Sequence, residues 1–100
     1  MRIISKRTLR EFWATHPRGA EAMTPLQVWH STSEGKDWAT PADVKATYGD
    51  ASILRNNRVV FNIGGNKFRL VVQINYRFRV VYIRFVGTHD EYDAIDAETI

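Results

Sequence analysis

Residues 58–92 constrain the fold of this chain more than any other part of the sequence. They contain three runs rich in β-branched and aromatic residues, which predict three β-strands. Gly64-Gly65 separates the first two runs, and glycine readily adopts the positive φ angles that a two-residue hairpin turn requires. With a second turn at Tyr76-Arg77, the stretch predicts a three-strand antiparallel meander.

The apolar residues of these runs set a register for the strands. A loop at Gly64-Gly65 places Phe61 opposite Phe68, and a loop at Tyr76-Arg77 places Phe68 opposite Phe85. Both hairpins therefore gather the apolar side chains on the same face of the sheet. A slip of one residue would instead bury cationic side chains, each of which is costly to bury unpaired.

In this register Arg69 lies directly opposite Arg84, on the face away from the apolar core. Two like charges roughly 5 Å apart are destabilising, and an anion between them would relieve the repulsion. Lys67 lies two positions along on the same face, and Arg58 is nearby at the far end. These four cations predict an anion-binding face; in the alternative interpretation the long arginine side chains splay apart into water.

His89 and Tyr92 follow the last strand in a predicted turn or short helix. A separation of three residues places two side chains on one face of a helix, here directed back toward Arg84. Histidine can transfer protons near neutral pH. The candidate catalytic set therefore combines cations with proton-transfer groups: Lys67, Arg69, Arg84, His89 and Tyr92.

The first part of the chain predicts an edge strand followed by helices. Residues 1–4 form a short apolar run that suits the strand. In residues 6–16, Leu9, Phe12 and Trp13 recur at the spacing of one helical face. The proline that follows ends this helix, because the residue before a proline is disfavoured in the α conformation.

Residues 20–32 predict a second helix, in which Pro25 marks either a kink or a late start. Thr40-Pro41 opens a third helix of about two turns. We expect Trp29 to lie in the core rather than to stack on a ligand. The pattern as a whole predicts a single α+β domain over residues 1–100. An N-terminal strand, a two-helix hairpin and a short third helix pack on a mainly antiparallel sheet that ends in the meander.

The net charge of +3 hides an uneven distribution. All fourteen Lys and Arg residues lie in residues 2–84 with only six of the eleven acids, so this part carries a net charge of +8. A basic body predicts a polyanionic partner, nucleic acid ahead of a membrane, although a merely solvated basic surface is the alternative. The chain has no cysteine and no apolar run near the ~20 residues that span a bilayer. We therefore expect a soluble cytoplasmic protein.

Several kinds of catalytic site have no signature in this sequence. There is no His, Cys, Asp and Glu set with metal-ligand spacing, no nucleophile motif and no phosphate-binding glycine loop. Cations with a histidine and a tyrosine, without metal or cofactor, fit phosphodiester cleavage in RNA. In that reaction the 2′-hydroxyl is the nucleophile, and the protein needs only to move protons and stabilise charge.

Two segments of the sequence resemble a known family. Residues 60–70, VFNIGGNKFRL, and residues 81–93, VYIRFVGTHDEYD, are similar to the HigB toxins, RelE-like members of bacterial type II toxin–antitoxin systems. The N-terminal strand and the helices fit as well, so the resemblance covers nearly the whole chain. It implies a RelE-like fold with the order β-α-α-β-β-β.

The resemblance also implies an activity and partners. The activity is a ribosome-dependent, metal-independent endoribonuclease, or mRNA interferase, that cleaves translated mRNA and inhibits translation. The partners are the ribosome, the mRNA and a HigA-type helix-turn-helix antitoxin, through which alone the toxin would meet promoter DNA. Arg69, His89 and Tyr92 match family positions, whereas Lys67 and Arg84 depend on the register argument. The residues expected to bind RNA are Arg58, Lys67, Arg69 and Arg84.

Two alternatives remain open at this point. The chain could be an RNA-binding module without catalysis, or an inactive toxin relative that acts only in the antitoxin complex. The acidic C-terminal tail also has two interpretations. It is either a frayed, solvated terminus, or a segment in which Asp93 or Asp96 folds back onto the basic face.

Overall fold

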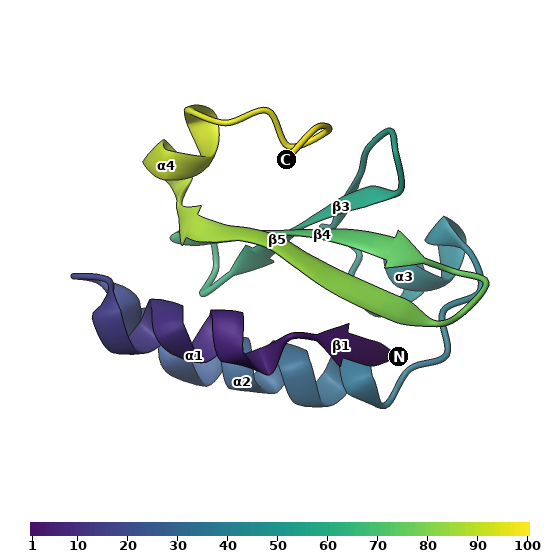
Figure 1. The fold of residues 1–100 in the computed structure, drawn as a ribbon, viewed down its shortest axis with the longest axis horizontal. Coiled ribbons are helices and arrows are strands. Elements are labelled where there is room, and N and C mark those ends of the chain that lie inside the picture. Colours follow the sequence, from purple (N-terminus) through teal and green to yellow (C-terminus); the bar gives the residue numbers. More distant parts are fainter.

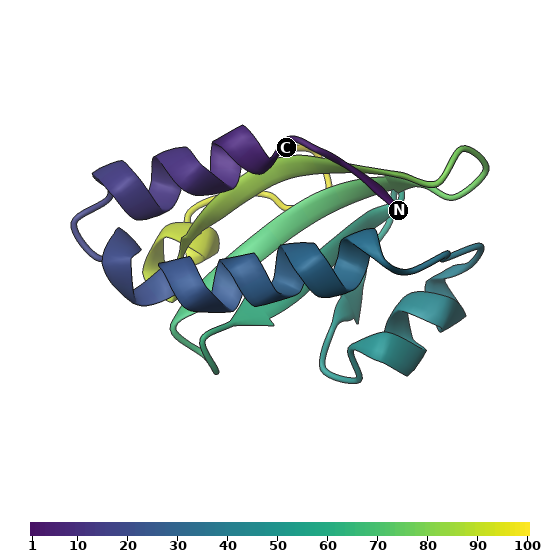
Figure 2. The same cartoon turned by 90° about the horizontal axis from the view of Figure 1, so that it is seen from below.

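The computed structural model describes residues 1–100 and has an α+β fold. Helices α1 (Lys6–Thr15) and α2 (Gly19–Glu34) lie side by side against one face of a sheet (Figures 1 and 2). The sheet has five strands in the order β1-β5-β4-β3-β2, and only the β1–β5 pair is parallel. The strands are β1 (Arg2–Ile4), β2 (Ser52–Ile53), β3 (Arg58–Ile63), β4 (Phe68–Asn75) and β5 (Val80–Thr88). This architecture confirms the predicted edge strand, helical hairpin and meander.

The helices begin and end close to where the sequence signals fall. Pro25 lies inside a continuous α2, so a late start at this proline is ruled out. Helix α3 (Pro41–Thr47) begins with a capping box, in which Thr40 Oγ1 accepts from the Asp43 N–H and Asp43 Oδ2 accepts from the Thr40 N–H. Such reciprocal bonds satisfy the free amides of a first helical turn. No helix of the structure combines the length and apolar character needed to cross a bilayer.

The main core lies between the two long helices and the sheet. Trp29 from α2 is 3% exposed and packs its ring 5.3 Å from that of Phe61 in β3. Trp38 is equally buried, and its indole N–H donates to Thr47 Oγ1 at 3.1 Å, which ties the loop after α2 to α3. The prediction that Trp29 belongs to the core is confirmed.

The first hairpin has a register that differs by two residues from the predicted one. Residues 64–67 form a four-residue turn, with Gly64 and Gly65 at φ angles of 62° and 70°. Phe61 therefore pairs with Leu70 rather than with Phe68. Because side chains alternate between faces with a period of two, every residue of the hairpin stays on its predicted face.

The second hairpin overturns the predicted pair of arginines. Its turn comprises residues 76–79, so the register next to the turn already differs by two residues from the predicted one, with Val72 opposite Ile83 rather than Val81. A β-bulge after Ile83 then makes Arg84 an extra, unpaired residue of β5. Beyond the bulge, Arg69 lies opposite Gly87, and Phe85 lies opposite Val71 rather than Phe68. Phe85 therefore packs on the face away from α1 and α2, and its predicted place on the core face is wrong. The predicted Arg69–Arg84 pair is therefore wrong, and its like-charge repulsion does not occur. A bulge of this kind shifts one strand against the other by a single residue.

The sheet face opposite α1 and α2, here called the second face, carries a smaller apolar cluster. Its buried residues are Val60 and Val71 from the strands and Ala97 from the C-terminal segment, residues 94–100. Figure 1 shows helix α4 (His89–Asp93) and this segment on the side of the sheet away from α1 and α2. The second face is therefore partly covered by the end of the chain.

The C-terminal segment is held in place, so the prediction of a frayed terminus is wrong. Its main-chain oxygens accept hydrogen bonds from Arg58 and Asn56. Asp93 binds His89, and the Asp96 carboxylate accepts from the N–H of Glu98 two residues away. Neither acid pairs with a lysine or an arginine, because the segment is attached by apolar packing and main-chain hydrogen bonds.

Candidate active site

Three of the predicted site residues come together at one end of the sheet. Lys67 ends the β3–β4 turn, and its carbonyl oxygen accepts a hydrogen bond of 3.2 Å from the N–H of His89 at the start of α4. Arg69 is two residues further along β4, opposite Gly87. The turn, the strand and the short helix thus place two cations and an imidazole on neighbouring backbone positions.

The Arg69 guanidinium is fixed on one side and open on the other. Its Nη1 donates to the carbonyl oxygens of Asn66 at 3.1 Å and Phe68 at 3.2 Å. Its Nε and Nη2 have no hydrogen-bond partner in the protein. A guanidinium held in this way presents two parallel donors, the geometry that binds a phosphate or carboxylate with two hydrogen bonds.

Lys67 is exposed and has one weak partner. Its Nζ lies 3.6 Å from Oε1 of Glu21, an acid at the start of α2. The hydrogen bond from Arg18 lowers the pKa of Glu21, and the Lys67 charge adds to the effect. Because an exposed ion pair of this kind contributes little stability, Lys67 can exchange Glu21 for an anion at small cost.

His89 and Tyr92 occupy different surroundings on α4. The His89 side chain is half exposed, and its Nδ1 lies 3.1 Å from Oδ2 of Asp93, which leaves Nε2 free. Tyr92 is half-buried and packs against the apolar cluster of the second face, beside Phe85. Of the two, His89 is therefore the more accessible to a substrate at this end of the sheet.

A group of possible metal ligands lies at the same place. The ligand atoms of His89, Asp90 and Asp93 are all within 4.8 Å of one another, and all three residues are exposed. The sequence search for metal-ligand spacing missed this trio because it lies within one turn of a five-residue helix. All three residues are exposed on α4, and no other element of the fold orients them.

His16 and Glu91 are two site residues that the sequence reasoning did not include. His16 Nδ1 accepts from the N–H of Arg18 at 3.0 Å, so in the neutral ring Nε2 carries the proton and donates to Glu91 Oε1, also at 3.0 Å. The pKa of Glu91 is lowered, first because the Thr88 N–H donates to it and second because of His16. Glu91 thereby connects α4 to the loop between α1 and α2.

The sequence contains a signal for one of the two contacts of Glu91 and none for the other. The spacing Thr88-x-x-Glu91 is the signature of a capping box, and the structure has both of its hydrogen bonds. Sequence reasoning could therefore have found this role of Glu91. Nothing local signals the contact with His16, since it joins residues 75 positions apart.

The remaining two predicted cations lie away from this end of the face. Arg84 is exposed and donates from Nε and Nη2 to Oε1 of Gln73, at 3.1 and 2.6 Å. Arg58 is only 9% exposed, and its guanidinium donates to the main-chain oxygens of Asn56 and Ile100. The structure therefore gathers Lys67, Arg69 and His89 and separates Arg58 and Arg84 from them.

Comparison with known proteins places the chain in a family. Residues 22–95 match the family HigB_toxin, described as the RelE-like toxic component of a toxin–antitoxin system. The chain belongs to the HigB toxin family. Among curated HigB relatives, mRNA interferase HigB of Escherichia coli O6:H1 is 28% identical over 97 residues, which is 95% of this chain and 91% of the relative.

Two further HigB relatives align over a similar length. mRNA interferase toxin HigB of Escherichia coli K12 and mRNA interferase HigB of Shigella flexneri are each 28% identical over 99 residues. Each alignment covers 97% of this chain and 92% of the relative. Membership of the HigB family agrees with the α+β fold and with the resemblance carried by the β3–β4 hairpin and the end of β5.

Proposed function

We propose that this HigB-family chain is a toxin that cleaves translated mRNA on the ribosome, without a metal ion. The observation that supports this most directly is the placement of Lys67, Arg69 and His89 on neighbouring backbone positions at one end of the sheet. Two cations can bind a phosphodiester there, and an exposed imidazole is within the same group. The names of the curated relatives, all mRNA interferases, support the same reaction class.

The proposed reaction uses the RNA's own 2′-hydroxyl as nucleophile. Its oxygen attacks the adjacent phosphorus as its proton passes to a base, and the bond from phosphorus to the 5′-oxygen breaks as that oxygen receives a proton. The products are a 2′,3′-cyclic phosphate and a free 5′-hydroxyl. Arg69 and Lys67 stabilise the charge that develops on the phosphate oxygens, and His89 transfers a proton, with Tyr92 as the second candidate.

The other proposed RNA contacts follow from where the cations lie. Arg84 is exposed on the same face, so it can contact the RNA strand beyond the scissile phosphate. Arg58 is occupied by the C-terminal segment, and it would reach RNA only if that segment left the sheet. The first contact set therefore consists of Lys67, Arg69 and Arg84.

The proposed partners follow from the family. A HigA-type helix-turn-helix antitoxin would bind the toxin and carry it to promoter DNA, which the toxin would not contact by itself. The ribosome would supply the mRNA, in the cytoplasm. The basic body of the chain, with all fourteen Lys and Arg residues in positions 2–84, suits a surface made of RNA.

Primer extension on a translated mRNA tests the proposed activity. We expect the wild-type chain to create new 5′ ends within codons when ribosomes are supplied, and none when ribosomes are left out. Arg69→Ala and His89→Ala should each lower the cleavage rate roughly 100-fold or more, the usual effect of removing a charge-stabilising donor or a proton-transfer group.

Matched variants and three contrary outcomes make this test decisive. Arg10→Ala removes an exposed arginine from α1 and should cleave like the wild type. Asp90→Asn removes one ligand of the possible metal trio and should also cleave like the wild type, so loss of cleavage in this variant would refute metal independence. Growth arrest without new 5′ ends would favour a non-catalytic RNA-binding module, and the absence of both would favour an inactive relative that acts only with its antitoxin.

A further inference from the structure

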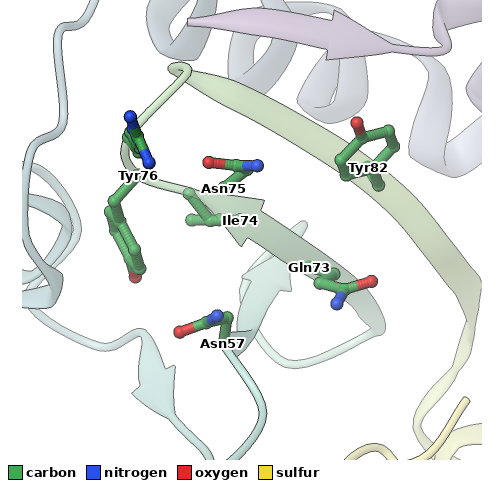
Figure 3. Close-up of a pocket in the computed structure, with 7 residues that line it drawn as sticks. Asn57, Gln73, Ile74, Asn75, Tyr76 and Tyr82 are labelled. Atoms are coloured by element: carbon green, nitrogen blue, oxygen red, sulfur yellow. The ribbon is translucent and has the colours of Figure 1, made fainter.

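No cavity encloses the candidate catalytic residues. The two pockets of the chain lie elsewhere, and Figure 3 shows the larger one, of about 370 Å³, around Gln73 and Tyr82. Neither pocket is lined by Lys67, Arg69 or His89. A site on an open surface keeps its geometry only if neighbouring elements hold its side chains in place, because no cavity wall restrains them.

The loop between α1 and α2 lies against this site. Figures 1 and 2 both show the loop at the same end of the molecule as α4. It consists of residues 16–18, and Gly19 is the first residue of α2. A side chain at Gly19 would not fit, because its Cβ would overlap the carbonyl oxygen of Phe12. The loop is therefore a closely packed corner of the fold.

His16 is fixed in this corner by three contacts. Its ring stacks on that of Phe12, with the ring centres 4.6 Å apart, and its Nδ1 accepts from the Arg18 N–H at 3.0 Å. The other nitrogen, Nε2, donates to the Glu91 carboxylate, whose two oxygens lie 3.0 and 3.2 Å away. Both ring nitrogens are occupied, so His16 itself has no free group for proton transfer.

Glu91 connects His16 to the start of α4. Its Oε1 also accepts from the Thr88 N–H at 2.8 Å, and the Thr88 hydroxyl oxygen accepts from the Glu91 N–H. These two bonds form the capping box of the helix whose first residue is His89. The His89 N–H in turn donates to the Lys67 carbonyl oxygen at 3.2 Å. A continuous set of hydrogen bonds therefore leads from His16 to the backbone that carries His89.

We propose that His16 is a positioning residue of the active site, which fixes α4 through Glu91 and thereby places the His89 imidazole beside the phosphate-binding cations. The proposal rests on the proposed function, because it concerns the geometry of that reaction. Helix α4 has five residues and the His89 side chain is half exposed, so few other contacts restrain them. A displacement of about 1 Å in a reacting group can lower a rate roughly 100-fold.

Three substitutions separate the Glu91 contact of His16 from its other contacts. His16→Ala removes all of them. His16→Asn keeps an oxygen near the position of Nδ1, where it can accept from the Arg18 N–H, but its side chain is too short to reach Glu91. His16→Gln extends an NH₂ donor to the neighbourhood of Nε2, where it can bind the Glu91 carboxylate.

Amide hydrogen exchange measures the positioning without cleavage. The His89 N–H is bonded to the Lys67 carbonyl oxygen, so its protection reports whether α4 stays in place. His16→Ala and His16→Asn should lower this protection by about 10-fold or more, the effect of losing a hydrogen bond to a charged group, whereas His16→Gln should retain most of it. Protection of the buried Val72 amide reports global unfolding and should fall less in every variant.

Cleavage kinetics separate positioning from RNA binding. On ribosome-bound mRNA, the rate at saturating toxin should fall roughly 10- to 100-fold in His16→Ala and His16→Asn. The toxin concentration that gives half of this rate should stay within about twofold of the wild-type value, because the phosphate-binding cations are untouched. His16→Gln should recover most of the rate. A purely structural role would lower the protection of Val72 and His89 together and leave the rate of the folded protein unchanged.

Two results would overturn the proposal. They are unchanged His89 protection in His16→Ala, and equal cleavage rates in His16→Asn and His16→Gln. If the wild type cleaved no mRNA while His89 protection followed the expected order of the variants, the proposed function would be wrong, and the positioning of α4 by His16 would stand.

Discussion

Three arginines of the second face differ in role because their guanidinium groups meet different partners. Arg69 keeps two N–H groups free beside Lys67 and His89. Arg84 orients the amide of Gln73. Arg58 is buried and hydrogen-bonded to main-chain oxygens on three of its nitrogens. Residue type alone therefore does not separate a substrate-binding arginine from a structural one.

Substitution of Arg58 and Arg69 should affect different properties. Arg58→Ala should lower the free energy of unfolding by about 2 kcal/mol, since it leaves carbonyl oxygens without the charged donors that satisfied them. Arg69→Ala should change this free energy by no more than about 0.5 kcal/mol, as expected for a surface site. Urea unfolding followed by circular dichroism measures both values.

Arg55→Ala is the control for this pair, because Arg55 is exposed and close to Arg58 in the chain. It should leave both stability and cleavage unchanged. If Arg58→Ala proved as stable as the wild type and lost cleavage, Arg58 would be an RNA-binding residue, and its contact with the C-terminal segment would not be its main role.

At the scale of the element, helix α4 depends on contacts made by one carboxylate. Glu91 caps the helix through the Thr88 N–H at 2.8 Å and holds His16 of the α1–α2 loop. A helix of five residues is too short to be stable alone in water, so these contacts and the packing of Tyr92 keep it folded. His89, its first residue, is positioned only as long as they hold.

The stability supplied by Glu91 should depend on pH. Its pKa is lowered below 4.5 in the folded chain, so its contribution is complete above about pH 5 and is lost as the pH falls through the folded pKa. The difference in unfolding free energy between wild type and Glu91→Gln should therefore be largest at pH 6 and shrink toward pH 3. Urea unfolding at a series of pH values measures it.

Glu98→Gln serves as the reference, because the Glu98 carboxylate has no hydrogen-bond partner in the structure. This variant should follow the wild-type profile throughout. A difference between wild type and Glu91→Gln that stayed constant from pH 6 to pH 3 would contradict the assignment of the lowered pKa to the cap.

The sequence predicts the elements and, as far as the bulge in β5, the faces of the sheet, but not its register. Alternation of apolar residues survives a shift of two positions, so Phe61 and Phe68 are correctly assigned to the core although they do not pair. The bulge at Arg84 has no local signal. It is one extra residue in an otherwise regular strand. It adds to the two-residue shift at the turn, which had already separated Arg84 from Arg69, and it puts Phe85 on the second face.

The sequence also predicts only part of the arrangement of the candidate site. Lys67 and His89 are close in the structure because the β3–β4 turn lies next to the end of β5, and antiparallel pairing alone predicts this. The burial of Arg58 was missed because it depends on a C-terminal segment with weak apolar content. Only three of its residues, Ile95, Ala97 and Ile100, join the cluster of the second face.

At the scale of the whole molecule, the middle of the sheet is buried on both sides. Helices α1 and α2 cover one face, and the C-terminal segment covers Val60 and Val71 on the other. A strand that is buried on both faces has a continuous apolar run in its sequence, as residues 70–72 do in β4. The end of the chain therefore acts as a second packing layer for β3 and β4.

Removal of residues 96–100 should expose this layer. We expect a loss of roughly 2–3 kcal/mol in the free energy of unfolding, comparable to uncovering one large apolar side chain. A hydrophobic dye such as ANS should bind the shortened chain and not the full chain. Urea unfolding and dye fluorescence together measure the effect.

The double variant Glu98→Ala, Thr99→Ala is the matched control, since both side chains lie outside the apolar cluster. It should unfold like the wild type and bind no dye. A shortened chain with unchanged stability and no dye binding would show that the segment lies loosely on the sheet, and that Arg58 is available to RNA after all.

The parallel pairing of β1 with β5 bears on how the protein is made. Strand β1 is synthesised early and can pair only after β5 has been synthesised. The His16–Glu91 contact likewise joins residues 75 positions apart. Contacts between such distant parts form late, after the intervening chain is available. A nascent chain thus lacks the arrangement of Lys67, Arg69 and His89 until nearly all of it has been translated.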